Sequence, residues 1–159
     1  MPLKPAFLLG AATSVIALSI AWGAAAQAAD APASLFDRPS PLPFQAPQFD
    51  RIKDADFKPA LEEGMRRDLA ENQKIADNPA PPTFQNTIVA MERAGQMLGR
   101  ADIVFEDLAQ ANTDDALQQV QTDEEPRLAA HHDAIYLNPK LFARVKAIYD
   151  RRNALGLDP

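Results

Sequence analysis

The stretch that decides the fold is ADFKPALEEGMRRDLAENQKIA, residues 55–76. Its apolar side chains recur about every four residues, which places them on one face of an α-helix. Charged side chains fill the other positions, so that face should meet water. We therefore predict an amphipathic helix over 55–76, capped by Asp54 or Asp56. Its expected apolar face comprises Phe57, Leu61, Met65, Leu69 and Ile75, and its expected exposed face comprises Glu62, Glu63, Arg66, Arg67, Asp68 and Glu71.

A second helix is expected over about 84–111, after the stop signal of Asn78-Pro79. Thr83 is its predicted N-cap. Two adjacent apolar stripes indicate that this helix contacts more than one neighbour. Gly95 and Gly99 weaken a helix, so we expect them to allow close approach of another helix backbone. The stripes are Phe84, Ile88, Met91, Leu98 and Phe105, beside Ala90, Ala94, Met97, Ala101, Val104 and Leu108.

Two further helices are expected after residue 112. The third covers about 114–136 with an N-cap at Asp114, and Pro126 should kink or split it. The fourth begins at Asn138-Pro139, a cap followed by proline at the first helical position, and Gly156 fits a C-terminal cap. Its predicted apolar side is Leu141, Phe142, Val145, Ile148 and Tyr149, and its predicted exposed side is Lys140, Arg144, Arg151 and Arg152.

The pattern along the whole chain points to one fold class. No segment alternates with period two, and no internal repeat is present. The length of 159 residues suits one domain. We therefore predict an all-α structure with about four helices.

The first 28 residues have the organisation of a signal peptide. Lys4 makes a short positive region, residues 7–22 are uncharged and mostly apolar, and Ala26-Gln27-Ala28 offers the small-x-small pattern that signal peptidase cleaves. Cleavage near Ala29 would deliver the mature protein to the periplasm or outside the cell. The alternative is an uncleaved membrane anchor, for which the apolar run is of borderline length.

Residues 29–47 are predicted to form a proline-rich leader. The spacing of its prolines excludes a helix and favours extended, polyproline-like chain. The segment contains no P-x-x-P motif, so we favour a semi-rigid leader packed on the domain over a ligand for a proline-binding domain. The prolines are Pro32, Pro39, Pro41, Pro43 and Pro47.

Charge and cysteine content exclude several classes of function. The chain has 22 acidic and 16 basic residues, a formal net charge of -6. Removal of Lys4 with residues 1–28 would leave 15 − 22 = −7. An acidic chain is poorly suited to nucleic acid or to an anionic membrane surface. The absence of cysteine excludes a disulfide framework, a thiol nucleophile and a cysteine-ligated metal.

The only histidines, His131 and His132, do not form a recognisable metal site. Adjacent residues on a helix point about 100° apart, unlike the i, i+4 pairs that hold zinc. No carboxylate lies three or four residues from either histidine. We expect one histidine to pack against the core and the other to face solvent.

The remaining candidates for chemistry are no stronger. A general acid–base pair needs one buried carboxyl with a raised pKa, and no pattern indicates one. Ser34 and Ser40 lack a G-x-S-x-G context, and no H-E-x-x-H or phosphate-binding glycine loop occurs. No catalytic, cofactor-binding or metal-ligating residue is therefore predicted in this chain. The carboxylates expected on solvated faces and caps are Glu62, Glu63, Asp114, Asp115, Asp123, Glu124 and Glu125.

Several segments, taken together, carry a family resemblance. They are PF at 43–44 with FDRI at 49–52, FKPALEEGM at 57–65, NP at 78–79 with TFQNTIVAMERAG at 83–95, DAIYLN at 133–138, and LFARV at 141–145. In order and spacing they resemble the N-terminal region of the thimet-oligopeptidase-like zinc metallopeptidases, in particular the peptidyl-dipeptidase branch of bacterial dipeptidyl carboxypeptidases. The resemblance covers about residues 43–158.

This resemblance implies that residues 48–159 are the N-terminal part of a larger helical lobe. Members of the family hold zinc with the two histidines of H-E-x-x-H and a downstream glutamate, and the motif glutamate activates the metal-bound water. The implied substrates are short peptides, from which C-terminal dipeptides are released. None of those motifs occurs in this sequence, so no catalytic residue is carried over, and His131 and His132 are not the family's zinc ligands. The chain would then be inactive alone, and its partner would be the missing C-terminal catalytic region.

A second hypothesis is a stand-alone exported helical module that binds peptides or a protein partner. The end of the chain, Leu157-Asp158-Pro159, reads equally as the start of a fifth helix or as an ordinary tail. If the chain is a fragment, some of the apolar surface on the helices over 84–111 and after residue 139 should lack its partner.

Overall fold

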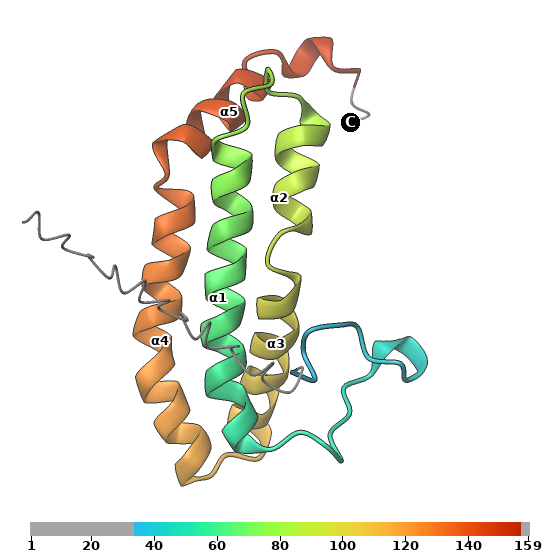
Figure 1. The fold of residues 1–159 in the computed structure, drawn as a ribbon, viewed down its shortest axis with the longest axis vertical. Coiled ribbons are helices and arrows are strands. Elements are labelled where there is room, and N and C mark those ends of the chain that lie inside the picture. Colours follow the sequence, from blue (N-terminus) through green and yellow to red (C-terminus); the bar gives the residue numbers. More distant parts are fainter. Residues whose placement is uncertain (1–33, 157–159) are drawn as a thin grey trace, which may run out of the picture. The chain divides into compact units, whose positions relative to one another are not determined.

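A computed structural model describes residues 34–156. The predicted signal peptide, the first part of the leader and the Leu157-Asp158-Pro159 segment lie outside the described residues. Residues 34–156 form helices and no strand, which confirms the predicted all-α class. The α-helices are α1 (Asp54–Ala76), α2 (Val89–Arg93), α3 (Gln96–Ala111), α4 (Asp115–Tyr136) and α5 (Pro139–Tyr149), as Figure 1 shows. Three shorter elements are the 3-10 helices η1 (Pro43–Gln45) and η3 (Arg152–Ala154) and the π-helical turn η2 (Phe84–Ile88).

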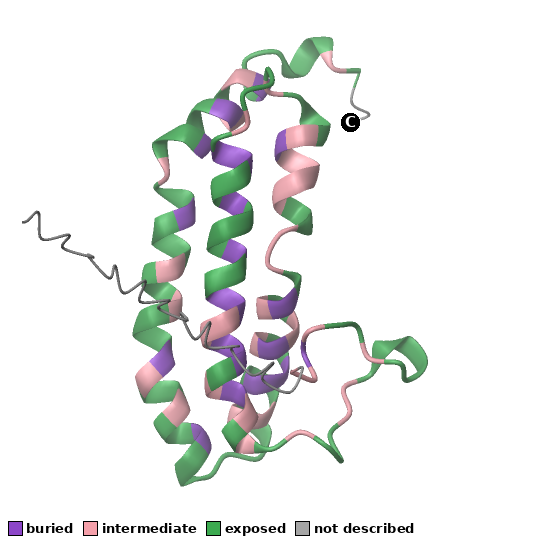
Figure 2. Cartoon of the chain, in the orientation of Figure 1, coloured by how far each residue is buried: buried purple, intermediate pink, exposed green. Residues whose placement is uncertain are grey.

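Helix α1 lies at the centre of the described fold, with α4 on one side and α2 and α3 on the other (Figure 1). Buried residues follow it over its whole length (Figure 2). The Asp56 carboxylate accepts a hydrogen bond from the Lys53 backbone N–H, 2.9 Å away, so Asp56 fixes the start of the helix as expected. Leu69 was predicted on the apolar face but is 41% exposed, whereas Asp68, predicted to be exposed, is buried.

The predicted helix over 84–111 is not continuous. Thr83 does cap its start, since its hydroxyl accepts from the Asn86 N–H and the Asn86 side chain accepts from the Thr83 N–H. The chain then forms η2 and α2, breaks at Ala94 and Gly95, and resumes as α3. Gly95 has φ +67°, a conformation that side chains with a Cβ rarely adopt, and its N–H donates to the Glu71 carboxylate. The break therefore follows from a contact with α1.

Glycine does permit close helix packing here, but at a position that the sequence analysis did not single out. A Cβ on Gly64 would lie 2.8 Å from the Leu98 Cα, so this glycine lets α1 and α3 approach each other. A Cβ on Gly99 would meet nothing within 4 Å, so the predicted role of Gly99 is wrong. At Gly95 a Cβ would meet the Asp68 side chain rather than another backbone.

Helices α4 and α5 begin with the predicted caps. The Asp114 carboxylate accepts from the Leu117 N–H, and the Asn138 side chain accepts from the N–H groups of Lys140 and Leu141. Pro126 lies inside α4 but does not split it, because α4 is helical from Asp115 to Tyr136. Gly156 was predicted to cap this fourth helix, but α5 ends at Tyr149 with Asp150 as its C-cap, and Gly156, with φ +63°, instead follows η3.

The side chains that join α1 to α4 show that the two helices run parallel and in register. Lys58 contacts Asp123, Glu62 contacts Arg127, and Asp68 contacts His131. The sequence separations of these pairs are 65, 65 and 63 residues, so each turn of α1 meets the corresponding turn of α4. Figure 1 shows the same parallel course for both helices.

Two apolar clusters lie at opposite ends of this parallel pair. The first joins the starts of α1 and α4 to α3 and to the leader residue Phe36. The second joins the ends of α1 and α4 to α5 and α2. The buried members of the first cluster are Phe36, Phe57, Ala60, Leu61, Met97, Ala101, Val104, Phe105 and Leu117, and those of the second are Ile75, Ala76, Ile135 and Leu141.

The described part of the leader is anchored at one end and exposed at the other. The Phe36 ring packs against Phe57 with ring centroids 5.7 Å apart, and the Arg100 guanidinium donates to the carbonyls of Phe36 and Asp37. Farther along, η1 replaces extended chain, and Phe44 and Gln45 have positive φ values of 57° and 58°. No helix among residues 34–156 is both long enough and apolar enough to cross a membrane.

Candidate functional site

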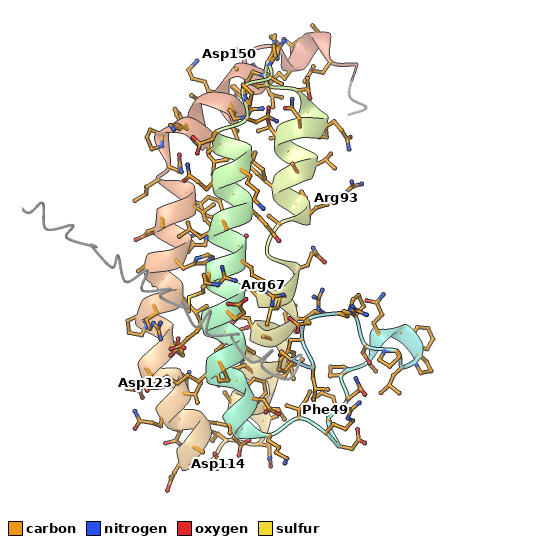
Figure 3. All side chains as sticks on the ribbon, in the orientation of Figure 1. Phe49, Arg67, Arg93, Asp114, Asp123 and Asp150 are labelled. Carbon is orange, nitrogen blue, oxygen red and sulfur yellow. The ribbon has the colours of Figure 1, made fainter. Side chains whose placement is uncertain are left out.

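Most side chains capable of acid–base or ligand chemistry lie in one layer between the two apolar clusters, along the α1–α4 contact. Figure 3 shows these side chains, with Asp123 labelled on α4. The layer was not predicted, because the sequence analysis assigned its carboxylates to solvated faces. We call it the polar seam; it comprises Lys58, Glu62, Asp68, Asn72, Asp123, Glu124, Arg127 and His131.

One half of the polar seam is a buried aspartate–histidine pair. The His131 Nε2 lies 2.9 Å from one Asp68 carboxylate oxygen, and the Asn72 side-chain amide donates to the other oxygen at 2.7 Å. The two paired side chains are only 9% and 13% exposed. His132, by contrast, is exposed and stacks on Tyr136 with ring centroids 4.1 Å apart. The expectation of one packed and one exposed histidine is therefore confirmed, with a carboxylate partner that comes from another helix.

The other half of the polar seam surrounds Glu124, whose side chain is completely buried. One Glu124 carboxylate oxygen accepts from the Arg127 guanidinium at 2.9 Å and lies 3.8 Å from the Lys58 ammonium. The other oxygen has no hydrogen-bond partner in the structure. Arg127 also donates to Glu62, which links α4 to α1. Glu124 was expected to be solvated, and this expectation is wrong.

The exposed rim of the seam holds a strong ion pair. The Lys58 ammonium donates to the Asp123 carboxylate at 2.6 Å. This hydrogen bond, followed by one from Gln119, lowers the pKa of Asp123, and the same Asp123 bond raises the pKa of Lys58. The hydrogen bond to Glu62 likewise raises the pKa of the Arg127 guanidinium. These groups are therefore held in their charged forms.

The donor set does not fit a zinc site. Structural and catalytic zinc sites take at least three nitrogen, sulfur or carboxylate ligands around one point. Among residues 34–156, no three His, Cys, Asp or Glu side chains are arranged to hold a metal ion. His131 is instead engaged with Asp68, and its carboxylate partner is in turn bonded to Asn72. The chemistry available to the seam is charge pairing between helices.

Arg144 forms a second buried polar site, at the end of the fold. It was predicted on the exposed side of its helix but is only 6% exposed. Its guanidinium donates to the carbonyls of Asn78 and Ala80 and to the Asn86 side chain. These bonds fasten the proline-rich turn between α1 and η2 onto α5, and Arg151 adds a bond to the Pro82 carbonyl. This arginine therefore shapes a turn.

The other candidate residues have local roles. The Ser34 and Ser40 hydroxyls accept from backbone N–H groups two residues ahead. Glu63 accepts from Arg66 and Arg67, and these bonds lower its pKa to about 2. Burial, and then the nearby Glu106, raises the pKa of Asp102 on α3. An open polar depression lies between the end of α3 and the start of α4, lined by Ala109, Thr113, Gln118, Gln121, Thr122 and Glu125.

Comparison with characterised proteins identifies relatives over most of the chain. The chain is 46% identical over 119 residues to the dipeptidyl carboxypeptidase of Salmonella typhimurium. It is 45% identical over the same length to the dipeptidyl carboxypeptidase of Escherichia coli. In each case the match covers 75% of this chain and 18% of the relative, so the chain spans less than a fifth of the length of these proteins. No protein-family model matches the chain. The resemblance to the peptidyl-dipeptidase branch is confirmed.

Proposed function

We propose that this chain, which is homologous to a segment of the bacterial dipeptidyl carboxypeptidases, is a non-catalytic helical part of an exported zinc peptidyl-dipeptidase. In the whole enzyme, it supports a catalytic region that removes dipeptides from short peptides. Zinc and the catalytic glutamate belong to residues outside 34–156. The chain alone neither binds zinc stoichiometrically nor cleaves peptides.

The observation that carries this proposal is the 45–46% identity over 119 residues. Identity at this level over 75% of the chain favours common descent over an unrelated helical module. The relatives are named for their activity as whole proteins, and this chain corresponds to 18% of each. The activity therefore comes to this chain as part of a larger polypeptide.

The polar seam is consistent with a supporting role. Each strongly interacting side chain of the seam contacts a side chain from the facing helix or the next turn. A nucleophile or general base must instead reach a substrate atom in an accessible site. The seam therefore suits a rigid α1–α4 pair rather than a reaction centre.

Export is the second part of the proposal. It is supported by the positive start, the apolar run and the small-x-small pattern of residues 1–28. The mature protein is expected to begin near Ala29 in the periplasm. Intact mass measured on a periplasmic fraction tests this, because a mass that retains residues 1–28 favours the membrane-anchor alternative.

A chimaera tests the enzymatic part. The homologous 119-residue segment of the Escherichia coli enzyme is replaced by the corresponding residues of this chain, and release of dipeptides from a blocked tetrapeptide is measured. We expect the chimaera to cleave and the isolated chain to be inactive. A folded but inactive chimaera, together with an isolated chain that binds peptides, would favour the stand-alone binding module.

A further inference from the structure

The outer surface at the α4–α5 end of the fold carries four large side chains in contact with water. Tyr136 and Leu137 end α4, while Phe142 and Tyr149 lie on α5. Their exposed fractions are 65%, 76%, 65% and 60%. Their neighbours in sequence, Ile135, Leu141 and Ile148, are buried in the fold, so both helices have apolar residues on two faces. We call the outer four residues the aromatic face.

Local geometry places these residues near one another. Asn138 caps α5, so Leu137 precedes the cap and Phe142 is the fourth helical residue. These are the two positions that pack together in a hydrophobic staple, but here both side chains remain largely in water, 76% and 65% exposed. Phe142 and Tyr149 are seven residues apart, which places both on one side of α5. The aromatic face therefore comprises one side of α5 together with the exposed residues that end α4.

The composition of the aromatic face is that of an interface centre. Tyrosine, phenylalanine and arginine are enriched where proteins meet, because they bury large areas at low conformational cost. Here the Arg152 guanidinium lies over the Tyr149 ring, 4.1 Å from its centroid, and His132 stacks on Tyr136. The sequence analysis had assigned Phe142 and Tyr149 to the packed side of their helix, and both are instead on the unoccupied side.

The size of the aromatic face indicates which kind of partner covers it. Large side chains bury about 150–250 Å² each, so four that are roughly two-thirds exposed offer about 500 Å². Separate proteins that form a stable pair bury about 800 Å² on each partner. A contact within one polypeptide can be smaller, because the covalent connection removes most of the entropy cost of association. The relatives, of which this chain covers 18%, have a large remainder of polypeptide that could supply such a contact.

We propose that the aromatic face of α4 and α5 is the surface on which the remainder of the peptidase polypeptide packs, through an apolar surface of its own. This inference rests on the proposed function. It assigns a docking role to Phe142 and Tyr149 that is separate from the internal packing of Leu141 and Ile148.

Thermal melting of the isolated chain and of the chimaera tests the proposal. The double variant Phe142→Ser/Tyr149→Ser should leave the melting temperature of the isolated chain nearly unchanged and lower that of the chimaera by about 5 °C or more. The control Leu141→Ala removes a side chain that is 2% exposed, so it should lower both melting temperatures. Equal effects of the double variant on both proteins would overturn the proposal.

Two measurements on the purified chain complete the test. The wild-type chain should bind the dye 1,8-ANS, and the double variant should lose most of that fluorescence. A wild-type chain that binds no dye would overturn the proposal. A wild-type chain that sediments as a dimer, with a double variant that sediments as a monomer, would also overturn it and would assign the face to a second copy. Dipeptide release by the chimaera is scored separately. If the chimaera is active but the double variant does not lower its melting temperature, only the docking proposal is refuted. If the chimaera is inactive but the double variant does lower its melting temperature, only the proposed function is refuted.

Discussion

Helix α1 has two long contacts, of which one is mainly apolar and the other mainly polar. Toward α3 it presents Phe57, Leu61 and Gly64, which pack among apolar side chains. Toward α4 it presents Lys58, Glu62 and Asp68, which form hydrogen bonds with polar side chains of α4. Apolar burial stabilises whatever side chains fit, whereas ion pairs are selective for their partners. The α3 side should therefore supply most of the stability, and the α4 side the parallel register.

The largest expected effect is on the apolar side. Phe57 is fully buried, and its ring lies 5.7 Å from the Phe36 ring and 5.4 Å from the Phe105 ring. Phe57→Ala should lower the free energy of unfolding by about 3–5 kcal/mol, because it removes buried surface and leaves a cavity. Urea denaturation measures the change. Phe49→Ala is the control, since Phe49 is 53% exposed and its loss should cost at most about 0.5 kcal/mol. Similar effects of the two variants would contradict the assigned core.

The next effect concerns the charged side. Arg127→Met should lower the midpoint of urea denaturation, because the buried Glu124 carboxylate loses its closest cation and keeps Lys58 only at 3.8 Å. The double variant Glu124→Met/Arg127→Met should be more stable than the single one, because the buried charge is then gone as well. Denaturation curves for the four proteins of this cycle give the coupling. If the double variant is instead less stable than Arg127→Met alone, the seam is a net source of stability.

Substitutions at two glycines should have smaller effects on stability, and these effects should have opposite signs. Gly64→Ala places a methyl group 2.8 Å from the Leu98 Cα and should cost about 1–3 kcal/mol by forcing α1 and α3 apart. Gly99→Ala meets open space in a helix and should stabilise the chain by about 0.5–1 kcal/mol. Melting temperatures of both variants are compared with the wild type. A loss of stability at Gly99 would show that α3 has a neighbour on that side.

The sequence could predict the apolar side of α1 far better than the charged side. Phe57 and Leu61 follow the helical period, which predicts a buried apolar face, and both are fully buried. Asp68 and Glu124 lie at positions where the helical pattern predicts exposed residues. A charged side chain is buried only where a specific partner neutralises it, so both were expected to be solvated. His131, the partner of Asp68, becomes visible only when the parallel course of α4 is known. Arg127 lies three residues after Glu124 on the same helix, but the sequence does not show that Glu124 is buried.

The break at Gly95 and the burial of Arg144 escaped prediction for a related reason. The chain breaks between α2 and α3 at Gly95, whose N–H bonds to Glu71 and where a Cβ would lie 2.8 Å from the Asp68 Cγ, both residues being on another helix. Arg144 is buried because the turn after α1 brings two free carbonyls beneath it. The polar seam itself was not predicted, because its carboxylates were expected on solvated faces. The residues next to Gly95 and Arg144 in the sequence do not indicate that these distant groups will contact them.

The smallest effect is a loss of stability in acid. The pKa of Glu63 is lowered from 4.5 to about 2 by its bonds with Arg66 and Arg67, and Arg67 also pairs with Asp37 of the leader. A carboxyl whose pKa is depressed on folding stabilises the protein above about pH 4.5, and this contribution is lost as the pH falls toward 2. Glu63→Gln should flatten the dependence of the melting temperature on pH in that range. An unchanged slope would show that the Glu63 bonds are broken in solution.

In the proposed function, this chain contributes structure rather than chemistry to a peptidase. Zinc content of the purified chain, measured after dialysis against metal-free buffer, tests it most directly. We predict much less than one zinc per chain, because neither histidine of the described fold lies in a cluster of metal ligands. One zinc per chain that disappears in His131→Ala/His132→Ala, accompanied by release of dipeptides from a blocked tetrapeptide, would contradict the account.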